Sequence, residues 1–93
     1  MIFKSLKLYL GAEIDLEQTL NILVDFCYKK QEMVAQEGDF SLRGGIIDIF
    51  PFTFELPVRF ELDDARIVSV KSFAPADGSP LYEHKMAIIL PVG

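Results

Sequence analysis

Residues 38–51 read Gly-Asp-Phe-Ser-Leu-Arg-Gly-Gly-Ile-Ile-Asp-Ile-Phe-Pro. Two runs of β-forming residues, 40–43 and 46–50, stand on either side of Gly44-Gly45. A Gly-Gly pair between such runs is typical of a hairpin turn, because glycine adopts positive φ without steric cost. A bulged bend within one long strand is the alternative. In either case, this stretch predicts β structure in the middle of the chain.

The β pattern continues after this stretch. In residues 58–62, Val-Arg-Phe-Glu-Leu, apolar and charged side chains alternate, so the apolar ones share one face and Arg59 and Glu61 share the other. The remaining predicted elements after the helix are a weak strand at 31–36, a loop at 51–57, a turn at 63–65, a strand at 66–73, a polar loop at 75–80 and a strand at 86–90.

Before this β region the pattern is that of a strand followed by a helix. Residues 6–10 alternate apolar and polar and predict a short strand. Asp15 stands at an N-cap position with Gln18 three residues later, as in a capping box. Apolar residues then recur at steps of three and four, which predicts an amphipathic helix over about 16–29. Cys27 lies on the apolar stripe and is predicted to be a small buried hydrophobe.

The order is therefore strand, helix and then about five strands joined by short turns. Short sequential connections favour antiparallel pairing, with the helix covering one sheet face. The chain has 93 residues, of which 51% are hydrophobic and 25% charged, as is typical of one globular domain. We predict a single α+β domain over residues 1–93, with one amphipathic helix packed on a mainly antiparallel sheet of about five to six short strands.

Charge and cysteine content narrow the function and the compartment. The formal net charge is −5 and there is no run of Lys or Arg, so direct nucleic-acid binding, which depends on neutralising phosphates, is not expected. The single cysteine cannot form an internal disulfide, and residues 1–7 lack the features of a secretory signal. No stretch approaches the roughly 18 apolar residues that span a bilayer. We expect a cytoplasmic protein without membrane contact.

Catalytic and cofactor motifs are not found in the sequence. There is no phosphate-binding glycine loop of either common type. One His and one Cys make a zinc cluster or a Cys/His nucleophilic pair implausible. His84 is predicted to be a solvated surface side chain. Asp63-Asp64 is more typical of a turn than of a carboxylate pair for catalysis or metal binding. We therefore expect no enzyme activity, cofactor or metal.

What remains is an unusual polar pattern. Arg43 precedes the glycine pair, and Asp48 interrupts an apolar strand. If the helix covers the apolar face of residues 58–62, then Arg59 and Glu61 project from an open face. Aromatic side chains stand nearby in the sequence, at Phe50, Phe52 and Phe54. Such a face suits protein recognition, and the alternative is a solvated sheet face with a cross-strand ion pair of little energetic value.

Residues 38–51 closely resemble a run in the transcription-repair coupling factors (Mfd) and, with more divergence, in the nucleotide-excision-repair subunit UvrB. Four further stretches resemble the same family at matching spacing: 8–28, 57–62, 67–73 and 87–91. The arginine-glycine turn together with the later Arg-x-Glu strand is a specific combination, and the resemblance covers nearly all of residues 6–92. The chain is thus similar to the UvrB-homology domain, which is the UvrA-interaction domain of those proteins.

In those families this domain docks on UvrA, the damage-sensing ATPase. The resemblance therefore implies a UvrA-like partner and a role in recruiting nucleotide excision repair. It places the binding arginines at Arg43 and Arg59, with a partnering acid at Glu61. The residues implied at the edge of the site are Lys30, Phe50 and Phe52.

The family's ATPase and translocation motifs lie in other domains, so the resemblance implies a non-enzymatic fragment of a larger ATP-dependent DNA translocase. Ser41 and Glu37 stand where UvrB carries basic residues, which makes this surface less basic than that of UvrB. In the coupling factors another domain of the same protein can cover the surface. Two alternatives stay open: a structural or autoinhibitory spacer domain within the motor, and a weak nucleic-acid-binding module.

Overall fold

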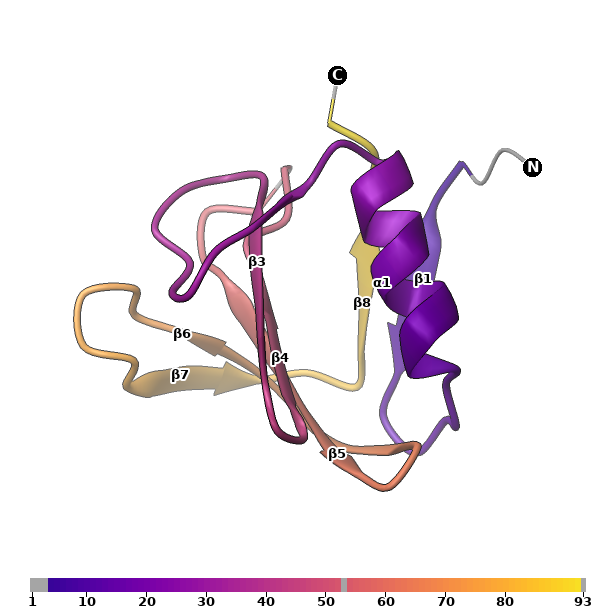
Figure 1. Cartoon of the computed structure of the whole chain (residues 1–93). Coiled ribbons are helices and arrows are strands. Elements are labelled where there is room, and N and C mark those ends of the chain that lie inside the picture. Colours follow the sequence, from indigo (N-terminus) through magenta and orange to yellow (C-terminus); the bar gives the residue numbers. More distant parts are fainter. Residues whose placement is uncertain (1–3, 53, 93) are drawn as a thin grey trace.

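The computed structural model describes residues 4–52 and 54–92 and shows, within them, one helix and eight strands in two sheets (Figure 1). The element bounds are β1 Leu6–Tyr9, α1 Leu16–Asp25, β2 Lys29–Lys30, β3 Asp39–Arg43, β4 Ile46–Ile49, β5 Val58–Asp63, β6 Arg66–Phe73, β7 Pro80–Glu83 and β8 Met86–Ile89. The first residues of the chain, 1–3, and Thr53 of the predicted 51–57 loop lie outside the described residues.

The predicted α+β class is confirmed, with a division into two sheets that the sequence pattern did not indicate. One sheet has the strand order β2-β3-β4-β5-β6-β7, and β1 pairs with β8 in a second, two-stranded sheet. All pairings are antiparallel except β2 with β3, which is parallel. Figure 1 shows α1 beside β1 and β8, with β3 and β4 of the larger sheet next to them.

The glycine pair forms a hairpin turn and not a bulge. Arg43 of β3 lies opposite Ile46 of β4, which leaves Gly44 and Gly45 as the two loop residues. Gly44 has a φ of 56°, the left-handed conformation that glycine adopts at little cost. Gly45 serves a different purpose, because a Cβ there would lie 2.8 Å from the carbonyl oxygen of Leu62. The backbone amide of Leu62 in turn donates to the carbonyl of Gly45 at 2.7 Å.

The predicted strand over residues 58–62 is confirmed as β5. Its apolar residues Val58 and Phe60 are fully buried, whereas Glu61 is exposed. The turn into β6 is also as predicted, and Asp64 accommodates it with a φ of 53°. Asp tolerates this conformation better than most residues because its short side chain bonds locally to the backbone.

Helix α1 begins as predicted but ends early. The carboxylate of Asp15 accepts a hydrogen bond from the backbone amide of Gln18 at 3.0 Å, which caps the first turn. The helix ends at Asp25, four residues before the predicted end near residue 29. The apolar spacing continues past the point where the backbone leaves the helix, so the pattern overestimated its length.

The early end is a Schellman motif, in which Cys27 takes the left-handed position with a φ of 70°. The backbone amide of Tyr28 donates to the carbonyl of Leu23 at 3.0 Å, and the backbone amide of Cys27 donates to the carbonyl of Val24 at 2.9 Å. Because the chain reverses at this residue, the Cys27 side chain is exposed. The prediction that it is a buried hydrophobe was therefore wrong.

The main core lies between α1, the β1–β8 pair and one face of the six-stranded sheet. The helix contributes Ile22, Leu23 and Phe26 to it. Its remaining buried members are Leu8, Tyr28, Phe40, Ile47, Ile49, Val58, Phe60, Ile67, Val70, Ala87 and Ile89. Since one face of the larger sheet is committed to this core, the other face is available for a different role.

Three further predictions differ from the structure. Residues 31–36 form no strand, whereas Lys29–Lys30 pairs with β3 as β2. Strand β7 was missed, because its short sequence follows directly on a loop rich in Pro and Asp. His84 was predicted to be a solvated surface side chain, but it is half-buried and its Nε2 lies 3.1 Å from the hydroxyl of Ser72.

Candidate functional site

The sheet face opposite the core carries the charged residues singled out in the sequence. Asp48 of β4 lies directly opposite Arg59 of β5, and Ile46 lies opposite Glu61. Arg43 of β3 lies opposite Ile46 in turn. Directly paired residues of antiparallel strands share a face. The register therefore places Arg43, Arg59 and Glu61 on one side of the sheet, as the alternation predicts.

Part of this face is covered by the loop between β2 and β3. Val34 of that loop packs with Phe50 and Phe73 in a second, smaller apolar cluster. The buried carboxylate of Asp39 accepts hydrogen bonds from the amides of Ala35 at 3.0 Å and Gln36 at 3.2 Å. These contacts hold the loop against the sheet instead of leaving it in solvent.

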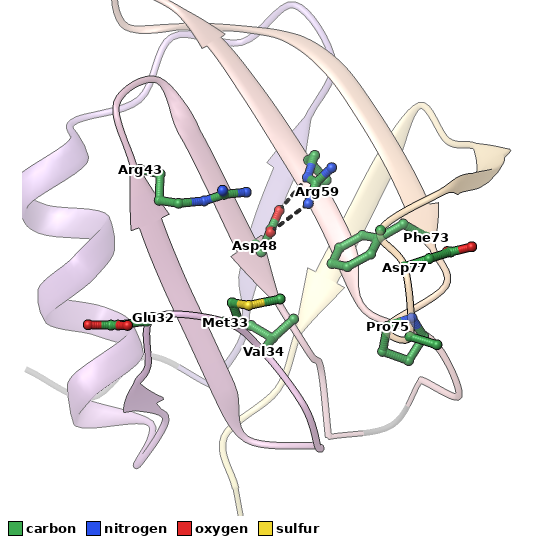
Figure 2. Close-up of a pocket in the computed structure, with 11 residues that line it drawn as sticks. Glu32, Met33, Val34, Arg43, Asp48, Arg59, Phe73, Pro75 and Asp77 are labelled. Atoms are coloured by element: carbon green, nitrogen blue, oxygen red, sulfur yellow. Dashed lines mark hydrogen bonds and ion pairs between the residues drawn. The ribbon is translucent and has the colours of Figure 1, made fainter.

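The loop that follows β6 faces the first loop, and a cleft of about 390 Å³ lies between them over the sheet. Figure 2 shows the side chains of Arg43 and Arg59, which share one sheet face, pointing into this cleft, with Phe73 beside Arg59 and Met33 below. The residues that line it are Glu32, Met33, Val34, Arg43, Asp48, Arg59, Phe73, Pro75, Ala76, Asp77 and Gly78. We call this the arginine cleft.

Arg59 is held rigidly at the centre of the arginine cleft. Its Nε donates to Oδ1 of Asp48 at 2.8 Å and its Nη2 to Oδ2 at 2.9 Å, a two-pronged ion pair. Its Cζ lies 4.5 Å from the centroid of the Phe73 ring, a cation–π contact. The hydrogen bonds to Asp48 raise the pKa of Arg59 above its usual value, and the charges of Asp48 and Glu61 add to that effect. The guanidinium is thus fixed in position and charge.

The Arg43 side chain, by contrast, is exposed and makes no hydrogen bond or ion pair with another described residue. It also lines a second cleft of about 710 Å³ next to the first. The residues of this second cleft are Lys30, Gln31, Glu32, Met33, Leu42 and Arg43. The two hollows share Glu32, Met33 and Arg43 and are therefore neighbours, and we refer to them together as the groove.

The structure brings together some of the predicted site residues and separates others. Arg43, Arg59 and Lys30 all line the groove. Glu61 lies on the same sheet face as Arg43 and Arg59 but lines neither hollow. Phe50 is buried beneath the loop, where it supports the groove without lining it.

Phe52 is exposed but lines neither hollow. Its backbone amide donates a hydrogen bond to the Tyr28 hydroxyl at 3.0 Å.

Two residues of the groove, Phe73 and Met33, were not identified from the sequence, and Asp48 was noted there but not as the partner of Arg59. Asp48, and not Glu61, forms the ion pair with Arg59. The strand alternation contains the signal for this pair, but only once the register between β4 and β5 is known. Nothing in the sequence indicates that Phe73 and Met33 belong to a site, because Phe73 fits an ordinary strand pattern and Met33 fits a weak one.

Two features that would indicate other functions do not occur in the described part of the chain. Within residues 4–52 and 54–92, no three His, Cys, Asp or Glu side chains gather in a way that could hold a metal ion. No helix in that part is long and apolar enough to cross a membrane. What the groove offers chemically is a pair of guanidinium groups next to apolar surface.

The family model described as the UvrB interaction domain matches residues 6–93. The transcription-repair-coupling factor of Staphylococcus aureus (strain MSSA476) is 52% identical over 66 residues, and that of Bacillus subtilis (strain 168) is 46% identical over 67. The matched stretches cover 71% and 72% of this chain but 6% of each relative, so the chain spans a small part of their length. The chain belongs to the UvrB interaction domain family.

Proposed function

We propose that this domain is a docking module of a transcription-repair coupling factor, which binds a UvrA-like protein through the arginine cleft and so recruits nucleotide excision repair. The family membership and the names of the relatives support this assignment. Residues 1–93 act as a single domain of a longer protein. The domain binds and does not catalyse, and any ATPase or translocase activity belongs to other parts of that protein.

The observation that carries the proposal is the contrast between the two arginines. Arg59 is immobilised by Asp48 and Phe73, while Arg43 presents a guanidinium with no partner among the described residues. A preorganised cation loses little conformational entropy on binding, and an unpaired one has its full donor set for a carboxylate. Together they form a recognition element for an acidic surface.

The other predicted residues have supporting roles in this proposal. Lys30 extends the positive charge along the groove, and Glu61 offers a carboxylate on the same sheet face for a basic group of the partner. Phe50 fixes the floor of the site from below, and Phe52 extends the contact surface beyond the groove.

Arginine hot spots at protein interfaces cost about 2–4 kcal/mol when truncated, which corresponds to a loss of affinity of roughly 30- to 1000-fold. Titration calorimetry of this domain against a purified UvrA from the same source, at moderate salt, tests this. We expect saturable binding that Arg43→Ala weakens by that factor. The Arg43 side chain is exposed and pairs with no described residue, so circular dichroism should show an unchanged fold.

Arg66→Ala is the matched control. Arg66 is the third arginine of the chain and pairs on the surface with Glu13 at 3.0 Å, away from both hollows. It should bind UvrA as the unaltered domain does. Equal binding by the parent and Arg43→Ala would refute the site, and a folded domain that shows no binding at all would refute the docking function.

A further inference from the structure

Met33 is the most exposed large apolar side chain among the described residues, at 74%. Single exposed apolar residues are common on protein surfaces, so this exposure alone indicates nothing. Its location is what distinguishes it. Met33 lines the arginine cleft and also the neighbouring hollow, and therefore lies where the two join.

The fold holds Met33 in this place. The next residue, Val34, is buried against Phe50 and Phe73, and the amides of Ala35 and Gln36 are bound by the Asp39 carboxylate. The backbone on one side of Met33 is thus anchored at the sheet. With Val34 committed to the small apolar cluster, the adjacent Met33 is directed into the groove, as Figure 2 shows.

The carboxylates that line the groove pair with none of its described cations except Arg59. Asp48 is fully used by Arg59. Asp77 accepts from the amide and the hydroxyl of Ser79 at 2.9 and 2.7 Å. Glu32 is directed away from the guanidinium groups in Figure 2.

Lys30 and Arg43 make no ion pair among the described residues, so the hollow that they line together with Met33 combines free positive charge with an apolar side chain. This is notable in a chain whose net charge is −5.

We infer that Met33 is an apolar anchor of the docking site, and that the segment of the partner that enters the groove is acidic and carries a large apolar side chain close to its carboxylates. This inference rests on the proposed function. The carboxylates pair with Arg43 and Lys30, which sets the register of the segment. The apolar side chain packs on Met33 and Leu42, where the flexible thioether of methionine adapts to its shape.

The two kinds of contact predict different responses in the calorimetric titration against UvrA. Burial of a methionine side chain corresponds to a factor of about 10–100 in affinity, so Met33→Ser should weaken binding by about 10-fold or more without altering its salt dependence. Met33→Leu should restore most of the affinity. Arg43→Ala should weaken binding and also reduce its salt dependence, because it removes a charge contact.

Val24→Ser is the matched control, because Val24 is 59% exposed on α1 and lines neither hollow. It should leave the affinity unchanged. A direct readout comes from isotope-labelled methionine methyl groups: the resonance of Met33 should shift when UvrA is added, whereas that of half-buried Met86 in β8 should not.

The outcomes separate the inference from the function beneath it. If Arg43→Ala loses binding while Met33→Ser binds as the parent does, the docking function stands and the anchor is refuted. Equal losses from Met33→Ser and Val24→Ser would also refute it, because the effect would then not be specific to the groove. If the unaltered domain does not bind UvrA, the proposed function fails and this inference fails with it.

Discussion

The pair of Asp48 and Arg59 allows a quantitative test of how this site is held. The perturbation is a double-mutant cycle of Asp48→Ala, Arg59→Ala and the combined variant. The Asp48 side chain is 6% exposed and the Arg59 side chain 25%, so the pair lies between the surface and buried limits. Breaking a buried pair by removing one partner costs about 3–5 kcal/mol, and an exposed pair contributes about 0–1 kcal/mol.

The two single variants should differ in their cost. Arg59→Ala leaves a carboxylate that is almost fully buried without its partner and also removes the contact with Phe73, so we expect a loss of about 4 kcal/mol. Asp48→Ala leaves a guanidinium that can turn toward water, and should cost about 2 kcal/mol. A domain of this size is stable by roughly 5–14 kcal/mol, so both variants should remain folded.

The combined variant should cost less than the sum of the single ones by about 2 kcal/mol, because it leaves no unpaired buried charge. Urea denaturation followed by circular dichroism measures all four free energies of unfolding. A coupling energy below about 0.5 kcal/mol would show that the pair behaves as an exposed surface ion pair, and would refute the argument that Asp48 immobilises Arg59. A larger loss of stability in Asp48→Ala than in Arg59→Ala would also refute this argument.

Two other predictions concern parts of the fold that support the site. Tyr28→Phe removes a hydroxyl that donates to the carbonyl of Leu90 at 2.9 Å and accepts from the amide of Phe52, and should cost about 1–3 kcal/mol in urea denaturation at neutral pH. Burial raises the pKa of the Tyr28 hydroxyl. The stability that this hydroxyl contributes is therefore present below its unfolded pKa near 10 and is lost as the pH rises through the folded pKa. Tyr28→Phe should lose less stability at alkaline pH than the unaltered domain, and an equal loss would contradict this. Gly45→Ala should lower the free energy of unfolding by about 1–3 kcal/mol, because its Cβ would lie 2.8 Å from a backbone oxygen. Gly44→Asn should cost less, because Gly44 has a left-handed backbone and open space around it. The reverse order of costs would contradict the roles assigned to the two glycines.

The central strands could be predicted because their signals are local. The alternation in residues 58–62 and the glycine pair at Gly44-Gly45 each depend on a few neighbouring residues, and both were confirmed. Alternation also assigns Arg59 and Glu61 to one face with no knowledge of the partner strand. The sheet face that carries the candidate site thus followed from the pattern alone.

What holds Arg59 could not be predicted in the same way. Its pairing with Asp48 depends on the register between β4 and β5, which are separated by a loop. A slip of one residue would move Asp48 to the core face. A charged residue inside an apolar strand indicates that a partner exists, but it does not say which one.

The end of α1 illustrates a further limit. The apolar spacing reaches Cys27, yet the backbone there is left-handed, a conformation usually taken by Gly or Asn. A cysteine in the sequence does not indicate this backbone conformation. The loop at 31–36 is similar, because its position is set by the distant contacts of Val34 and by Asp39. The first error arose from a backbone conformation that the residue type does not indicate, and the second from contacts between distant parts of the chain.

The pairing of β1 with β8 has a mechanical consequence. Leu6 lies opposite Ile89 and Tyr9 opposite Met86, so the chain enters β1 and leaves β8 at the same end of the ladder. Tension applied across those two points acts at right angles to the strands and loads one residue pair at a time. Strands pulled along their length would instead share the force over all their hydrogen bonds. A domain of this geometry placed in a protein under load yields from its ends inward, before the six-stranded sheet with its arginines is loaded.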